Sequence, residues 1–346
     1  MEFLSEYGMF LAKAVTILAV VLAATAGVVA LSSRGAPGRA KEHLEVKSLN
    51  DKYRETAQAL RSAMLPPPLA KRAAKEEKKR LKAEAKQLKH QPETGRHRLF
   101  VLDFHGDIRA SAVNALREEI SAVLAVATAE DEVLVRLESA GGMVHAYGLA
   151  ASQLQRIRQR NIPLTIAVDK VAASGGYMMA CVATRILAAP FAVLGSIGVI
   201  TQLPNFHRLL KKNNIDFEQI TAGDFKRTLT LFGENTEVAR QKLRDEVEDV
   251  HALFKAYVIE NRPQLDIERV ATGEHWHGIR ALDLKLIDEL RTSDDYLMNA
   301  SGERDLFEVR FVAKKPLLTR LLAAGTQLRQ SSTRFWQSDQ EPPSLM

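Results

Sequence analysis

The sequence predicts an α/β domain with a largely parallel sheet over residues 99–315. Two observations lead to this prediction. Short apolar runs typical of strands alternate along this region with longer helical patterns. The chain of 346 residues is also long enough to bury a substantial core, in one large or two ordinary domains.

The predicted strands are short runs of Val, Leu, Ile and Phe, and the predicted helices are longer segments between them. We expect strands over 99–104, 133–137, 164–168 and 306–311, and helices over 112–127, 144–160, 174–183 and 237–260. The domain is expected to continue through the apolar segments at 186–189 and 195–200. Residues 178–201 are apolar enough to suggest a membrane span. Arg185 and Pro190 interrupt this segment, and its place within the alternating pattern favours buried core instead.

The first 33 residues predict a membrane anchor. Residues 14–33 carry no charge and consist mostly of Ala, Val, Leu and Ile. Twenty helical residues span about 30 Å, the thickness of the bilayer's hydrocarbon core. A cleaved signal peptide, with residues 24–26 as its cleavage site, is the alternative interpretation.

Residues 34–98 predict a charged helical extension, which residues 66–68, all proline, divide into two parts. Residues 71–89 hold nine Lys or Arg against three Glu, so a solvated helix or linker is expected. Such a basic helix also suits contact with anionic lipid headgroups. No aromatic residues interleave its charges, which argues against nucleic-acid binding.

Charge and cysteine content set further limits. The formal net charge is +6, and basic residues follow the predicted span, so the positive-inside rule favours a cytoplasmic catalytic domain. A single cysteine, Cys181, excludes an internal disulfide framework, and its apolar surroundings indicate a buried structural thiol. We expect residues 316–346 to form a loose tail.

Ser174 is the most informative residue of the predicted domain. It precedes Gly175 and Gly176, between a predicted strand and an apolar helix. The glycines permit a tight turn and a close approach of other backbone, and a helix N-terminus favours negative charge. This setting suits a serine nucleophile, although an ordinary serine N-cap is the alternative.

A second glycine pair, Gly141 and Gly142, follows the strand predicted at 133–137. At the carboxyl edge of a parallel strand, its backbone amides are candidate donors for an oxyanion. An ordinary strand–helix turn is the alternative interpretation, because glycine pairs often make such turns.

The general base stays open when the residues alone are considered. Its histidine candidates are His105, His145 and His251. A lysine qualifies only if desolvation keeps it neutral near pH 7. Its lysine candidates are Lys170, Lys211 and Lys226. His275 and His277 flank a tryptophan without the Cys or carboxylate pattern of a metal site.

Four ordered motifs resemble the signal peptide peptidase A family of serine proteases, and especially its SohB-type inner-membrane proteases. The motifs lie at residues 171–177, 195–199, 221–227 and 272–278, the last leading to 286–288. The predicted anchor and charged extension also resemble that subgroup, so the likeness covers about residues 1–315.

The resemblance implies a Ser–Lys dyad with Ser174 as the nucleophile and Lys226 as the general base. It also implies that Gly142 and Gly175 supply the oxyanion amides, and that no metal or other cofactor takes part. The family's turn before the glycine pair usually reads Ser-Pro-Gly-Gly, whereas Ala140 replaces the proline here. The amides remain, so we expect the oxyanion hole to persist.

The resemblance further implies a ClpP/crotonase-like α/β spiral that forms homo-oligomeric rings and cleaves signal peptides or unfolded polypeptides. It implies a bacterial inner-membrane protein with its catalytic domain in the periplasm, opposite to the side that the loop charges favour. Two other hypotheses stay open: a crotonase-like acyl-transfer enzyme without protease activity, and a catalytically silent membrane scaffold.

Overall fold

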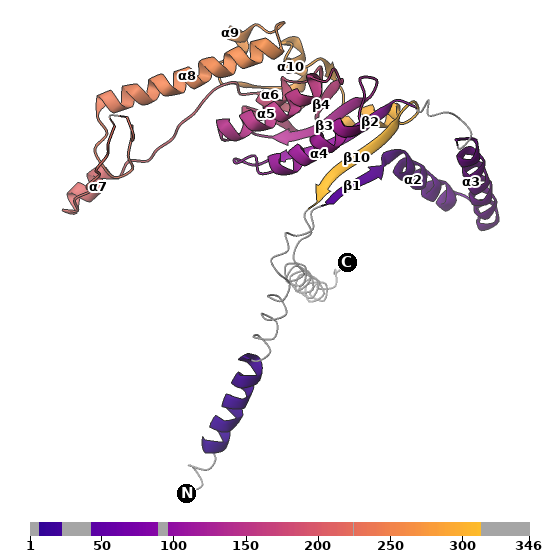
Figure 1. The fold of residues 1–346 in the computed structure, drawn as a ribbon, viewed down its shortest axis with the longest axis horizontal. Coiled ribbons are helices and arrows are strands. Elements are labelled where there is room, and N and C mark those ends of the chain that lie inside the picture. Colours follow the sequence, from indigo (N-terminus) through magenta and orange to yellow (C-terminus); the bar gives the residue numbers. More distant parts are fainter. Residues whose placement is uncertain (1–6, 23–42, 89–95, 224, 313–346) are drawn as a thin grey trace, which may run out of the picture. The chain divides into compact units, whose positions relative to one another are not determined.

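The computed structural model describes residues 7–22, 43–88, 96–223 and 225–312 (Figure 1). Leu44–Phe311 form one compact unit, and the helix at residues 7–22 belongs to a separate unit. In the described part of the chain, no helix is both long and apolar enough to cross a membrane. Residues 23–33 of the predicted span, and the whole predicted tail, lie outside the described residues.

A twisted, mostly parallel sheet forms the centre of the main unit, as the sequence predicts. Its strands lie side by side in the order β1 (His43–Ser48), β10 (Asp305–Val312), β2 (Arg98–Gly106), β3 (Glu132–Ser139), β4 (Leu164–Val168), β6 (Arg185–Ala188) and β9 (Glu289–Leu290). Every strand from β10 to β9 pairs in parallel with its neighbour. The predicted strand at 164–168 matches β4 at both ends, and the others differ by one or two residues.

The sheet branches at the end of β3, a feature that the sequence analysis does not predict. The middle of β3 pairs with β4, but its last residue, Ser139, pairs with Ala172 of β5 (Val171–Ala173). β5 then pairs with β7 (Val193–Gly195), and β7 pairs antiparallel with β8 (His275–His277). The branch therefore brings the end of β5, and Ser174 after it, beside the end of β3.

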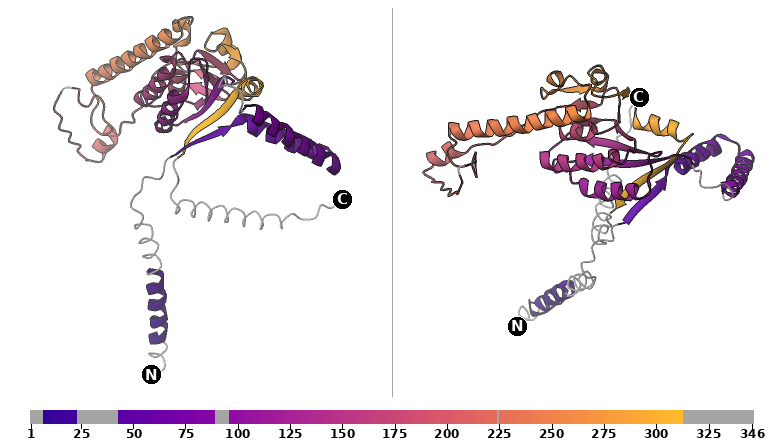
Figure 2. Two further views of the ribbon diagram at one scale, coloured as in Figure 1. Left: turned by 45° about the vertical axis from the view of Figure 1, so that its right-hand side comes forward. Right: turned by 45° about the horizontal axis from the view of Figure 1, so that its top comes forward.

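Helices cover one face of the sheet and bury the larger of two hydrophobic clusters (Figures 1 and 2). They are α4 (Val113–Val126), α5 (Val144–Arg158), α6 (Gly175–Ala180) and the C-terminal half of α8 (Glu237–Asn261). In α4 the buried residues recur at helical spacing, as in Leu116, Ile120 and Val123. The segment at 178–201 contributes α6, β6 and β7 to this core, as expected.

The other face of the sheet changes character along its strands. At the beginning of the strands a smaller apolar cluster forms, where Leu49 and Leu297 pack on Leu99 and Leu134. Leu49 belongs to α2 (Leu49–Met64), and Leu297 belongs to α11 (Ser293–Ala300).

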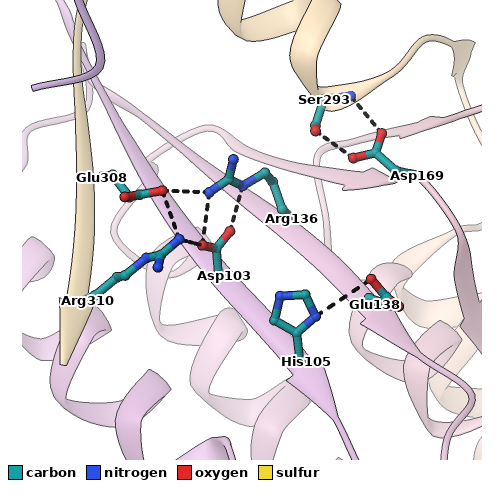
Figure 3. A network of polar contacts seen from close by, with 8 residues as sticks. All are labelled: Asp103, His105, Arg136, Glu138, Asp169, Ser293, Glu308 and Arg310. Carbon is teal, nitrogen blue, oxygen red and sulfur yellow. Dashed lines mark hydrogen bonds and ion pairs between the residues drawn. The ribbon is translucent and has the colours of Figure 1, made fainter. Parts of the chain in front are cut away.

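Further along the strands this face carries an ion-pair network (Figure 3). Arg136 binds Asp103 at 2.5 Å and Glu308 at 2.7 Å, and Arg310 binds Asp103 at 2.6 Å. The network joins β2, β3 and β10, so each of its partly buried charges has an opposite charge beside it.

The extension before the sheet differs in one respect from the prediction. α2 and α3 (Pro67–Leu88) are separated at the prolines, as predicted, but β1 forms within the segment expected to be helical. β1 adds an edge strand beside β10. The charged segment is therefore joined to the sheet at its start.

Residues 200–236, here called the arm, differ from the rest of the unit. They contain one short helix, α7 (His207–Lys212), and lie near the N-terminal end of α8, which reaches beyond the sheet and its helices (Figures 1 and 2). Of the 25 residues of α8, only Phe254 and Val258 are buried, and both lie in its C-terminal half.

Candidate active site

Ser174 lies in a sharp turn between β5 and α6. Its φ of +52° and ψ of −118° fall in a region that residues with a side chain rarely adopt. It occupies the N-cap position of α6, but its side chain makes no capping hydrogen bond. The N-cap interpretation therefore does not account for this serine, whose hydroxyl has no hydrogen-bond partner among the described residues.

Two of the other motifs hold this turn in place. The amide of Ser174 donates to the carbonyl of Gly195 at 2.8 Å, and the amide of Ser196 donates to the carbonyl of Glu274 at 2.6 Å. Gly195 has a φ of +94°, and an added Cβ there would lie 2.8 Å from the ring of Trp276. The motifs at 171–177, 195–199 and 272–278 thus meet around Ser174.

The glycine pair after β3 lies directly against the serine. A Cβ added at Gly141 would lie 2.7 Å from the Cβ of Ser174 and 2.8 Å from the amide nitrogen of Gly175. The amides of Gly142 and Gly175 have no hydrogen-bond partner among the described residues. The structure thus brings together Ser174 and the two segments expected to supply oxyanion donors.

None of the candidate histidines forms a hydrogen bond with Ser174 in the described part of the chain. His105 faces Glu138 at 3.6 Å, and His251 lies 3.3 Å from the carbonyl oxygen of Ile197. His145 is exposed on α5. A Ser–His pair within one chain thus finds no support in this geometry.

The candidate lysines do not reach Ser174 either. Lys170 is paired with Glu138 at 3.0 Å, and Lys211 is exposed on α7. Lys226 is exposed in the arm, and no hydrogen bond joins it to Ser174. Its amide donates to the carbonyl of Gly223 at 3.2 Å, which closes a local turn. The predicted dyad is thus not assembled within this single chain.

A cavity of about 320 Å³ lies elsewhere, over the polar face of the sheet. Its lining includes Asp103, Arg136 and Asp169, which are paired with other side chains (Figure 3). Two of the candidate bases, His105 and Lys170, also line it, but Ser174, Lys226 and the two glycines expected to supply oxyanion amides do not. Within the described ranges, no group of three or more His, Cys, Asp or Glu side chains is placed to hold a metal ion.

Two family models match this chain, and together they cover most of it. The N-terminal model of peptidase family S49 matches residues 2–154, and the model of peptidase family S49 matches residues 156–306. The probable protease SohB of Haemophilus influenzae is 48% identical over 345 residues, covering 96% of this chain and 94% of the relative. The chain belongs to peptidase family S49.

A second SohB relative agrees with this assignment. The probable protease SohB of Buchnera aphidicola subsp. Schlechtendalia chinensis is 46% identical, covering 86% of this S49 chain and the whole of the relative. Among solved structures, two mutants of the membrane-bound stomatin-specific protease 1510-N match with TM-scores of 0.40 and 0.39 at 16% identity. Each match covers 59% of this chain, and the two matches cover 84% and 80% of the respective solved chains.

Membership of S49 makes the chain a serine-type endopeptidase, a hydrolase. The resemblance derived from the four motifs is thereby confirmed. The hypothesis of a serine endopeptidase is also confirmed, in preference to a crotonase-like acyl-transfer enzyme and a silent scaffold.

Sequence reasoning missed two side chains that contact the site of this S49 peptidase. Ser139 and Tyr147 are buried beneath the glycine pair, with exposures of 2% and 0%. Tyr147 shares the apolar side of α5 with Ala150, Ala151 and Leu154. A tyrosine in such a row needs a buried partner for its hydroxyl, and this is the signal that could have identified it.

Proposed function

We propose that the chain cleaves signal peptides or unfolded polypeptides with Ser174 as the nucleophile, Lys226 as the general base, and the amides of Gly142 and Gly175 as the oxyanion hole. One observation carries the proposal: a serine without a capping bond occupies a strained turn beside two backbone amides that lack partners. Strained backbone of this kind clusters at functional sites.

The chemistry follows from this arrangement. The hydroxyl oxygen of Ser174 attacks the scissile carbonyl carbon while neutral Lys226 accepts the hydroxyl proton. The carbonyl oxygen becomes an oxyanion that the two amides bind. When the carbon–nitrogen bond breaks, Lys226 returns the proton to the leaving amine. Water then attacks the carbonyl carbon of the acyl-enzyme ester while Lys226 accepts its proton. The bond between that carbon and the Oγ of Ser174 breaks, Lys226 returns the proton to the serine oxygen, and the carboxylic acid product leaves.

Lys226 reaches a serine, in this proposal, through assembly of several copies into a ring. The arm that carries it exposes a large apolar surface, which suits contact with another copy rather than with water. Its exposed large apolar residues are Ile200, Leu203, Phe206, Leu209, Ile215, Phe217, Ile220, Phe225, Leu231 and Phe232. Within one chain, by contrast, no described base contacts Ser174.

Mixing two inactive variants tests this arrangement. Ser174→Ala and Lys226→Ala should each abolish cleavage of denatured casein, whereas Lys211→Ala, a matched exposed lysine on α7, should not. Co-expression of the two inactive variants should restore about a quarter of the parental activity, because random neighbours then complete a quarter of the sites. No recovery in mixed oligomers of confirmed composition would contradict a base supplied by a neighbouring copy.

The fold and location proposed for the chain go with this function. The branched sheet and its helices support assignment to the ClpP/crotonase-like spirals. Residues 14–33 support an anchor in the bacterial inner membrane. In α3, exposed Lys71, Lys75 and Lys78 recur at helical spacing, which supports contact with anionic lipid headgroups.

The side of the membrane is tested separately. Charge after the predicted span favours a cytoplasmic catalytic domain, and the family resemblance favours the periplasm. We propose the periplasmic side, because a family likeness over most of the chain outweighs a bias from a few charges. A reporter fused to Met346 and active on only one side tests this, and cytoplasmic activity would contradict it.

A further inference from the structure

We infer that Ser139 and Tyr147 form a buried hydrogen-bond chain that positions both oxyanion donors, an inference that rests on the function proposed above. The amide of Gly141 lies 3.1 Å from the Oγ of Ser139, which lies 2.5 Å from the Oη of Tyr147. The Oη of Tyr147 lies 2.7 Å from the carbonyl oxygen of Asp107. These hydrogen bonds thus link the ends of β2 and β3 to α5.

The direction of each hydrogen bond follows from counting protons. A neutral tyrosine has one hydroxyl proton, and a carbonyl oxygen can only accept, so Tyr147 donates to Asp107. Tyr147 therefore accepts from the hydroxyl of Ser139, and Ser139 accepts from the amide of Gly141. Burial raises the pKa of Tyr147, which keeps its phenol neutral and the direction fixed.

The side chain of Tyr147 and the backbone of Ser139 also contact the segment that follows Ser174. A Cβ at Gly175 would lie 2.4 Å from Cγ of Tyr147, so the ring of Tyr147 lies directly against the second donor. A Cβ at Gly176 would lie 2.5 Å from the carbonyl oxygen of Ser139. The backbone next to both proposed oxyanion donors, Gly142 and Gly175, is therefore in contact with the buried residues Ser139 and Tyr147.

The first donor is held from its other side by the loop after β2. The carbonyl of Ile108 accepts from the amide of Met143 at 2.8 Å, and a Cβ at Gly142 would lie 2.2 Å from that carbonyl oxygen. Because Tyr147 binds the carbonyl of neighbouring Asp107, it fixes this loop as well. Ser139 and Tyr147 are thus positioning residues, which act on the reaction through backbone amides.

Removal of either hydroxyl should lower turnover without weakening substrate binding. Losing one oxyanion donor typically costs about 10²–10³ in rate, so displacing one should cost less. In the full-length enzyme in detergent, we expect Tyr147→Phe and Ser139→Ala to lower kcat on labelled denatured casein by about 10–100-fold, with KM within about two-fold. The double variant should lose no more than the worse single variant, because both hydroxyls belong to one chain.

Tyr257→Phe is the matched control, because Tyr257 has a buried hydroxyl without a partner among the described residues. It should leave kcat unchanged. Parental kcat in both Tyr147→Phe and Ser139→Ala, or a raised KM with unchanged kcat, would overturn the inference. If Tyr147→Phe does not fold, Ser139→Ala alone decides between these results.

Labelling with a fluorophosphonate separates this inference from the proposed function. In the parental enzyme, mass spectrometry should locate the label on Ser174, and a label elsewhere would contradict the proposed nucleophile whatever Tyr147 does. If Ser174 is labelled, its labelling rate should fall in Tyr147→Phe by about the same factor as kcat. An unchanged labelling rate would overturn the positioning role alone.

Discussion

The surroundings of Ser174 and the arm that carries Lys226 are built in opposite ways. Around the serine, the Ser139 and Tyr147 hydroxyls are partnered, and three separate motifs meet in one packed core. Among the described residues of the arm, ten large apolar side chains are exposed, and Ile220 is 97% exposed. The ring pairs of the arm are local: the ring of Phe232 is stacked 6.1 Å from that of Phe206 and tilted 5.8 Å from that of Phe217.

The two residues of the proposed dyad thus lie in different surroundings, with Ser174 in the packed core and Lys226 in the exposed arm. The nucleophile and oxyanion amides need fixed geometry, and the core of a single chain supplies it. A lysine base needs instead to lose its water and become neutral, and an exposed arm supplies that only when it is covered. Assembly would thus couple activity to the oligomeric state, because no candidate base contacts Ser174 within the part of a single chain that the structure describes.

The largest loss of turnover should follow from replacing Ser174, at the centre of the packed region. Ser174→Ala should lower turnover of denatured casein by about 10⁴–10⁶-fold, as nucleophile deletions generally do. The melting temperature should stay within a few degrees, because no side-chain hydrogen bond of Ser174 is lost. Circular dichroism and a casein assay measure both quantities.

Retained turnover in Ser174→Ala would contradict the assignment of the nucleophile. A large fall in melting temperature would instead show that the side chain helps to hold the turn. The hydroxyl of Ser174 would then serve the stability of the turn and would not be free for the reaction.

A paired phenylalanine deletion contrasts the two regions directly. Phe104 is fully buried in the core, so Phe104→Ala should cost about 3–5 kcal/mol of unfolding free energy. Phe232 is 41% exposed in the arm, so Phe232→Ala should cost less than about 1 kcal/mol. It should nevertheless lower activity by about 10-fold or more, because the arm's surface for a neighbouring copy is weakened.

Urea unfolding and size-exclusion with light scattering separate these effects. Phe232→Ala should dissociate the oligomer while leaving the unfolding midpoint nearly unchanged. A fully active, fully assembled Phe232→Ala enzyme would contradict the role given to the arm.

The sequence predicted the layers of the fold better than its connections. Strands at 99–104, 133–137 and 164–168 are apolar runs whose burial on a parallel sheet is readable from composition. β5 was missed because its three residues, Val171–Ala173, are too few to show a pattern. β1 was missed because it lies in a polar segment, and its neighbour β10 is more than 250 residues away in sequence.

The candidate site was predictable in the same uneven way. Ser174 and the glycine pair stand in local motifs, and local sequence determines a turn and its exposed amides. The placement of Lys226 depends on how the arm is covered, which a spacing of 52 residues does not encode. Ser139 is the first residue of the turn that resembles the family's Ser-Pro-Gly-Gly, but its role appears only when Tyr147, from the next helix, is placed beside it.

The smallest change in stability and turnover should follow from replacing Ala140, the one residue that departs from the family's turn. Ala140 is exposed, and its amide has no partner among the described residues, so a proline there removes no hydrogen bond. The preceding residue, Ser139, is the last residue of β3, and an extended conformation is the one that a following proline favours. Ala140→Pro should therefore raise the free energy of unfolding by about 0.4–1 kcal/mol, by restricting the unfolded chain, with turnover within about two-fold.

Met143→Pro is the matched control for this prediction. Met143 already has a φ of −62°, which suits proline, but its amide donates to the carbonyl of Ile108 at 2.8 Å. Losing that bond should cost about 1–3 kcal/mol and lower turnover, because the carbonyl of Ile108 lies against Gly142. Urea unfolding of both variants gives the comparison. If Ala140→Pro unfolds as early as Met143→Pro, the turn in this chain differs from the Ser-Pro-Gly-Gly turn of its family, and the amide of Gly142 is positioned by other contacts.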